Sequence, residues 1–110
     1  MAAAWTRLIA LAAGALAWLP IAAQAEDTKI ERGKNVYIAQ RCSQCHAIGG
    51  VGNRRSPLDG VGDRLKEDEI RKWIVAPQEM NPKVRKKAYD KLRPDELEAL
   101  VAYLMSLKGK

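Results

Sequence analysis

Three stretches of the chain space their apolar residues in the way that is typical of amphipathic helices. The first is predicted over residues 29–40, where Thr28 and Glu31 form a capping-box pattern that marks a helix start. The second is predicted over residues 66–75 and the third over residues 94–108. No segment shows the alternation of apolar and polar residues that indicates a strand. The pattern therefore predicts an all-α chain.

The ends of the second and third predicted helices carry further signals. The second has acidic residues in its first turn, where the helix dipole favours anions, and it should end before Pro77. Pro94 suits the first position of the third helix, and Gly109 suits its end. Apolar residues share one face of each helix: Ile70, Trp73 and Ile74 in the second, and Leu97, Leu100, Val101, Leu104 and Leu107 in the third.

A glycine-rich stretch, residues 49–62, separates the first two predicted helices. It lacks the G-x-x-x-x-G-K-[ST] pattern of a phosphate-binding loop. We therefore expect irregular backbone that wraps around a flat cofactor.

Residues 1–25 differ from the rest of the chain in composition. Arg7 gives a positive start, residues 8–23 carry no charge, and Ala23-Gln24-Ala25 is a small-x-small cleavage pattern. These features predict a cleaved secretory signal peptide and a periplasmic protein. The alternative is a retained membrane anchor, although the apolar run is shorter than the ~20 residues that a spanning helix needs.

The remainder, residues 26–110, is predicted to form one small monomeric domain. A core of this size usually needs a staple, a metal or a cofactor. The net charge of the whole chain is +6, and six cations gather within eleven residues. We expect this cluster either to be a solvated face or to bind an acidic redox partner. No nucleic-acid-binding motif is present. The cluster consists of Lys83, Arg85, Lys86, Lys87, Lys91 and Arg93.

The only two cysteines and the only histidine of the chain lie within five residues, as Cys42, Cys45 and His46. This is the C-x-x-C-H pattern of c-type haem attachment, in which each thiol bonds one vinyl group and the histidine binds the iron. A closed structural zinc site needs four protein ligands, so a monomer of this chain cannot form one. A thioredoxin-like motif would accompany a βαβ pattern, and a simple disulfide would leave the histidine unexplained. One covalently bound haem c is therefore predicted.

These residues together resemble the class I c-type cytochromes over nearly all of residues 28–108. Gly33 and Tyr37 precede the motif as in that family's first helix, and the Ser-Pro-Leu-Asp-Gly sequence at 56–60 resembles its G-P-x-L-x-G loop. The segment 100–104 resembles its last helix, whose aromatic residue crosses the first helix at the small Gly33. The resemblance implies the all-α cytochrome c fold, with three main helices and a glycine-rich loop around one haem.

The same resemblance implies roles for three further residues. The Pro57 carbonyl should accept the Nδ1 proton of His46, which leaves Nε2 for the iron. Trp73 and Tyr89 should pack around the haem and could donate hydrogen bonds to a propionate. Arg54 and Arg55 could pair with propionates or lie on the surface.

The second axial ligand departs from the family pattern. Where the family has Met-Pro-x-Tyr, this chain has Lys-Lys-Ala-Tyr, ending at Tyr89. The prediction is that Lys86 binds the iron as a neutral amine. The alternatives are its neighbour Lys87, Met80 six residues earlier, water or an open site, and the mature N-terminal amine.

The sequence thus predicts an exported one-electron carrier and no enzyme. The rival of another class is a haem protein with an open or labile distal site that binds NO, CO or peroxide. Arg85 could act there as a distal donor, but the chain has no second histidine, so an efficient peroxidase is not expected. A subunit docked permanently on an enzyme is a third possibility.

Overall fold

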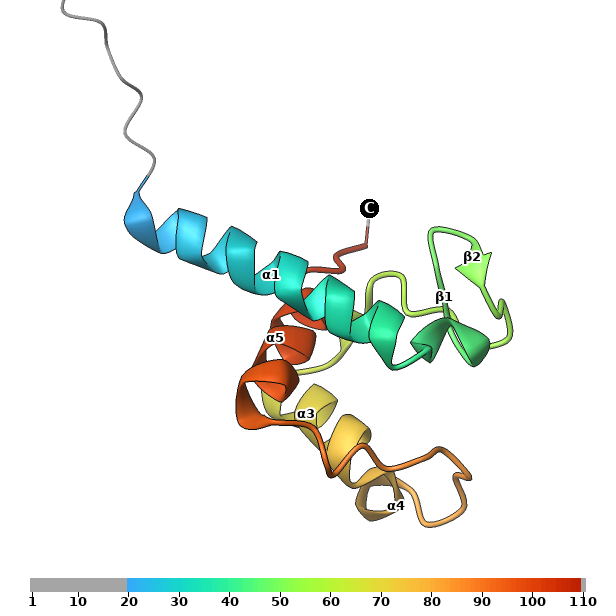
Figure 1. The fold of residues 1–110 in the computed structure, drawn as a ribbon. Coiled ribbons are helices and arrows are strands. Elements are labelled where there is room, and N and C mark those ends of the chain that lie inside the picture. Colours follow the sequence, from blue (N-terminus) through green and yellow to red (C-terminus); the bar gives the residue numbers. More distant parts are fainter. Residues whose placement is uncertain (1–19, 110) are drawn as a thin grey trace, which may run out of the picture.

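The computed structural model describes residues 20–109, and they form a helical fold with one short hairpin (Figure 1). The helices are α1 (Ile21–Ala39), α2 (Val61–Arg64), α3 (Glu67–Val75), α4 (Pro77–Met80) and α5 (Pro94–Met105). A 3₁₀ turn, η1 (Cys42–Gln44), follows α1, and strands β1 (Ala47–Ile48) and β2 (Val51–Gly52) pair antiparallel. The all-α prediction is confirmed, and the expectation of no strand is wrong only for this hairpin.

The fold is organised around the crossing of α1 and α5, with α3 packed against α5 on the other side (Figure 1). Gly33 makes the crossing possible, because a Cβ at this position would overlap the Ala99 carbonyl and the Tyr103 side chain. Tyr103 therefore crosses α1 at Gly33, as the resemblance implied. The ring of Tyr103 also meets the Tyr37 ring edge-on, with 5.8 Å between their centroids.

The buried core lies between these helices. Its fully buried members come from α1, α2, α3 and α5, and they include Leu100, Val101 and Leu104 of the predicted face of the third helix, whereas Leu97 and Leu107 are only partly buried. Trp73, predicted to share the face of Ile70 and Ile74, is only half-buried. The core consists of Val36, Tyr37, Val61, Ile70, Ile74, Leu100, Val101 and Leu104.

Helix α1 begins at Ile21, eight residues before its predicted start. The Thr28 hydroxyl does not cap a helix there but donates to the Gln24 carbonyl one turn earlier, at 2.9 Å. The predicted capping box is therefore not used, because the alanine-rich sequence after Pro20 continues the helix without a breaking residue. The described part of α1 runs across the predicted cleavage point after Ala25. Residues 1–19, which hold most of the predicted signal peptide, lie outside the described residues.

The other helix ends agree more closely with the prediction. Helix α3 ends at Val75, and its start is stabilised by the Glu69 carboxylate, which accepts the Lys66 N–H at 3.0 Å. Helix α5 starts at Pro94 but ends at Met105, three residues earlier than predicted. The chain turns back there because Gly62 N–H donates to the Leu107 carbonyl at 3.0 Å, which ties the tail to α2. Among the described residues, no helix is long and apolar enough to cross a membrane.

Candidate haem site

The haem-attachment motif occupies the turn that follows α1. Arg41 adopts a left-handed conformation, with φ 57°, and so reverses the chain out of the helix. The backbone N–H groups of Cys45 and His46 then both donate to the Cys42 carbonyl, at 3.1 and 3.0 Å. Cys42 is half-buried against the core, whereas Cys45 is exposed. Both are free thiols, so the alternative of a disulfide between them is not formed in the structure.

His46 is held from its Nδ1 side by Ser56. The ring nitrogen lies 3.1 Å from the Ser56 carbonyl oxygen and 3.0 Å from its hydroxyl oxygen. The sequence predicted the Pro57 carbonyl as the acceptor of the Nδ1 proton, but the carbonyl that lies there belongs to Ser56, one residue earlier. The cause is a parallel bridge between Ala47 and Pro57, in which the Ala47 N–H donates to the Ser56 carbonyl at 3.2 Å and turns that carbonyl toward the histidine. With Nδ1 donating, Nε2 remains free to bind a metal.

The hairpin that follows fixes the backbone of His46. Gly52 has φ 108°, and a Cβ there would collide with the His46 carbonyl oxygen. The Asn53 N–H also donates to this carbonyl, at 3.0 Å. At the tip, Gly49 N–H donates to the Asp59 carboxylate at 2.7 Å. The first part of the glycine-rich stretch thus belongs to a tight hairpin, more regular than the sequence suggested, and its last residues begin α2.

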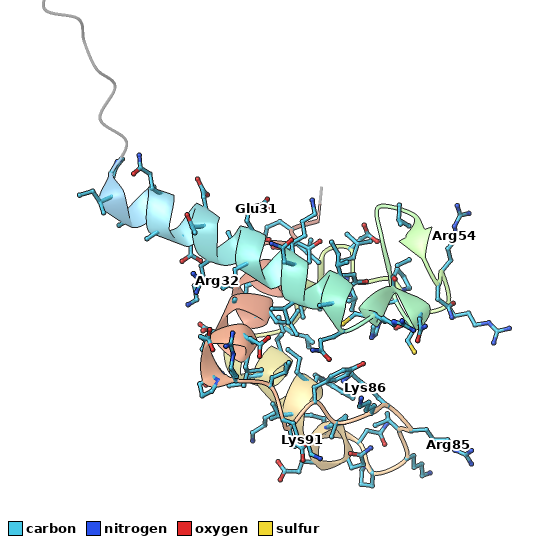
Figure 2. All side chains as sticks on the ribbon, viewed as in Figure 1. Glu31, Arg32, Arg54, Arg85, Lys86 and Lys91 are labelled. Atoms are coloured by element: carbon cyan, nitrogen blue, oxygen red, sulfur yellow. The ribbon has the colours of Figure 1, made fainter. Side chains whose placement is uncertain are left out.

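The loop of residues 81–93 forms the opposite side of the site. Lys86 of this loop is half-buried, whereas Lys87 and Arg85 are exposed. In Figure 2, Lys86 lies on the side of the loop that faces α1, and Arg85 points outward. The Lys86 ammonium lies 5.0 Å from the centroid of the Tyr89 ring and donates to the Lys87 carbonyl at 3.1 Å.

Lys86 and the haem-attachment motif influence each other's pKa values. Burial lowers the pKa of Lys86, against the opposing influence of the two cysteines. Burial also lowers the pKa of His46; the Ser56 carbonyl opposes this shift and the charge of Lys86 adds to it. Burial raises the pKa of the Cys42 thiol, and the Lys86 charge acts in the opposite direction. One ammonium group therefore acts on both the half-buried cysteine and the histidine.

The remaining residues that the sequence predicted for the site differ in how far they are buried. Trp73 and Met80 are half-buried, on α3 and at the end of α4, and Tyr89 packs against the core. Arg54 and Arg55 are exposed, and Arg54 extends away from the body in Figure 2.

Two residues of the site were missed by the sequence reasoning. Ser56 could have been suspected from its place before Pro57. The amide of Gln78, on α4, donates to the Lys86 carbonyl at 3.0 Å, and no sequence signal points to this contact.

The residues present fit covalently bound haem. The donor set offers two thiols for attachment and one imidazole nitrogen for the iron. The buried Tyr37 hydroxyl has no hydrogen-bond partner among the described residues. Burial, followed by the influence of Cys42, raises its pKa to about 12. Since an unpaired buried hydroxyl is costly, its place near Cys42 suits a site where a large group attaches at this cysteine.

Comparisons with known proteins agree with this geometry. Residues 30–108 match the family model described as "Cytochrome c". The chain is also 31% identical over 91 residues to a cytochrome c oxidase subunit 2 of Alkalihalophilus pseudofirmus, which covers 74% of this chain. The chain spans only 27% of that relative's length. No solved structure matches. The chain thus belongs to the cytochrome c family, has the cytochrome c fold, and is a haem electron-transfer protein.

Proposed function

We propose that this protein is an exported one-electron carrier with His46 and Lys86 as the two axial ligands of its haem iron. Cys42 and Cys45 would attach haem c through their sulfur atoms, and His46 Nε2 would bind the iron. The bound haem supplies a one-electron couple between ferric and ferrous iron. The protein's own residues hold and tune that couple, and no catalytic residue is proposed.

The half-buried position of Lys86 is the observation that supports it as the second ligand. Lys86 lies on the side of the loop that faces α1, whereas Lys87 is exposed. Releasing a proton from an ordinary lysine at pH 7 costs about 4 to 5 kcal/mol, which burial reduces. The alternative Met80 ends a separate short helix, α4. Lys86, by contrast, lies in the loop of residues 81–93, on the side that faces α1.

A lysine ligand has a consequence for the reduction potential. A neutral amine is a harder ligand than a thioether, so it favours ferric iron and lowers the potential relative to His/Met ligation. We therefore propose a low-potential carrier. A potential in the usual range of His/Met cytochromes would contradict this.

The partner would be a redox protein with an acidic docking face. The loop that carries Lys86 also exposes four members of the basic cluster, Lys83, Arg85, Lys87 and Lys91. Arg93 contributes less, because it already pairs with Glu96 at 3.3 Å. Association would be transient, and its rate should fall as ionic strength rises.

Export and a monomeric state complete the proposal. Export rests on the composition of residues 1–25, and association with a membrane would follow only if that segment is retained. Mass spectrometry of the purified protein would show whether the chain starts at Glu26 and carries one haem.

The axial ligands can be tested by absorption and low-temperature EPR spectra of the ferric holoprotein. The wild type should be low-spin and lack the red-edge charge-transfer band of a thioether ligand. Lys86→Ala should become high-spin, whereas Lys87→Ala, the matched control, should keep the wild-type spectrum. A charge-transfer band that disappears in Met80→Ala would show His/Met ligation instead. A high-spin wild type would contradict both and favour an open site that binds small ligands.

A further inference from the structure

The Nδ1 atom of His46 has two hydrogen-bond partners, and both belong to Ser56. The carbonyl oxygen lies at 3.1 Å and the hydroxyl oxygen at 3.0 Å. The loop pattern G-P-x-L-x-G has glycine before its proline, so a hydroxyl here is a departure of this chain from that pattern. Both residues are half-buried, and their hydrogen bonds are therefore partly shielded from water.

The two oxygens are held independently of each other. The carbonyl is fixed by the backbone, because it accepts the Ala47 N–H at 3.2 Å while Leu58 N–H donates to the Ala47 carbonyl at 2.8 Å. The hydroxyl depends only on the Ser56 side chain. Replacing Ser56 with alanine should therefore remove one acceptor and leave the other in place.

We propose that the Ser56 hydroxyl is a positioning residue that lowers the reduction potential through His46. When Nε2 binds a metal, Nδ1 carries the proton and can only donate. The two Ser56 oxygens then share this proton, the hydroxyl accepting through a lone pair while its own proton points elsewhere. Each acceptor draws the proton away from the ring and makes the imidazole a stronger electron donor. A stronger donor favours the more positive, oxidised iron.

This inference rests on the proposed function in one respect, that His46 binds the iron. It does not depend on Lys86, because Ser56 acts through His46, whereas Lys86 is itself the other proposed ligand. The two effects should therefore add.

The experiment uses the holoprotein with Ser56→Ala, Ser56→Thr and the control Ser106→Ala. Ser106 is exposed at the end of α5, where its hydroxyl bonds the Tyr103 carbonyl, so the control also loses a local hydrogen bond. Spectroelectrochemistry gives the reduction potential. Proton NMR of the ferrous form gives the solvent exchange rate of the His46 Nδ1 proton.

Ser56→Ala should favour the ferrous form several-fold, up to about tenfold, which corresponds to about 59 mV for one electron. Its Nδ1 proton should exchange several-fold faster than in the wild type. Ser56→Thr, which keeps the hydroxyl, should restore both values toward the wild type. Ser106→Ala should change neither.

Two results would overturn the inference. Ser56→Ala could match Ser106→Ala in both readouts, or Ser56→Thr could shift as far as Ser56→Ala, which would indicate altered packing. A wild type without covalent haem would instead refute the proposed function, and this inference with it. An unchanged spectrum of Lys86→Ala would refute only the distal ligand and leave the Ser56 result standing.

Discussion

The two sides of the haem site are built differently. On the proximal side, His46 is fixed by neighbours within ten residues of it: the Cys42 carbonyl, the 47–52 hairpin and both oxygens of Ser56. On the distal side, Lys86 lies in a loop without helix or strand, residues 81–93. Between its ends, this loop is held to the helices by the Gln78 amide and by a backbone bond from Tyr89 N–H to the Ile74 carbonyl at 2.8 Å.

The difference shows which parts of the site can change in sequence without loss of the fold. The proximal side depends mainly on backbone hydrogen bonds, so it tolerates a side-chain change that keeps the backbone, as at Ser56, but not one that displaces it, as at Gly52. The distal loop presents a long side chain from a segment with few anchors, so we expect that substitutions at one or two of its positions could change the proposed ligand and keep the fold. The proposed Lys86 ligand, at the place of Met-Pro in the family pattern, would be an example of such a change.

The largest loss of stability is expected at the crossing of α1 and α5, which supports the proximal side of the haem site. Gly33→Val would push its side chain into the Ala99 carbonyl and Tyr103. Because two backbones meet there, the free energy of unfolding should fall by about 3 kcal/mol. Denaturant unfolding of the holoprotein measures this. Ala39→Val, at an exposed position of the same helix, is the control. A loss no larger than that of the control would show that the crossing tolerates separation.

A smaller effect, confined to alkaline pH, is expected at Tyr37. Burial raises its pKa to about 12, from an ordinary value of 10.0. Below pH 10 the hydroxyl is protonated in both the folded and unfolded states and contributes no pH dependence. Above pH 10 the unfolded state loses the proton first, so stability should fall as pH rises toward 12.

The Tyr37→Phe variant should not show this fall in unfolding free energy, which amounts to about 2 to 3 kcal/mol at pH 12. Unfolding curves of both proteins between pH 7 and 12 give the comparison. The two profiles should run parallel up to pH 9, which serves as the internal control. Profiles that stay parallel to pH 12 would mean that the Tyr37 hydroxyl ionises as freely as in the unfolded chain.

The smallest effect on stability is expected on the distal side, at Gln78. Its amide donates to the carbonyls of Lys86, at 3.0 Å, and Val84, at 3.4 Å, and it is exposed. Gln78→Ala should therefore cost at most about 1 kcal/mol in unfolding free energy. The looser loop should let added imidazole displace the distal ligand up to about tenfold faster, as measured by stopped-flow absorption.

The neighbouring Glu79→Ala supplies the control for Gln78, since it is exposed on the same short helix. Equal displacement rates in wild type and Gln78→Ala would show that the loop is held by other contacts. A change in the exchange rate of the His46 Nδ1 proton would show that the two sides of the site are coupled.

Most of the fold could be predicted from periodicity and end signals. Helices α3 and α5 were predicted to within a few residues, because their apolar faces and first-turn acids are local features. The start of α1 was missed, because a capping pattern marks a possible start and cannot force one when a good helix-forming sequence precedes it. The hairpin at 47–52 was missed because each strand has only two residues, too few for alternation to show.

By itself, the sequence indicated the chemistry, because Cys42, Cys45 and His46 lie within five residues in the pattern that is typical of haem attachment. Their spacing is local, so no fold is needed to read it. Only the tertiary structure decided what surrounds them. It gave His46 the two oxygens of Ser56 in place of the Pro57 carbonyl, and it left Lys86 half-buried while Lys87 is exposed. Such choices depend on how loops distant in sequence meet, and a shift of one residue in register changes which side chain faces the site.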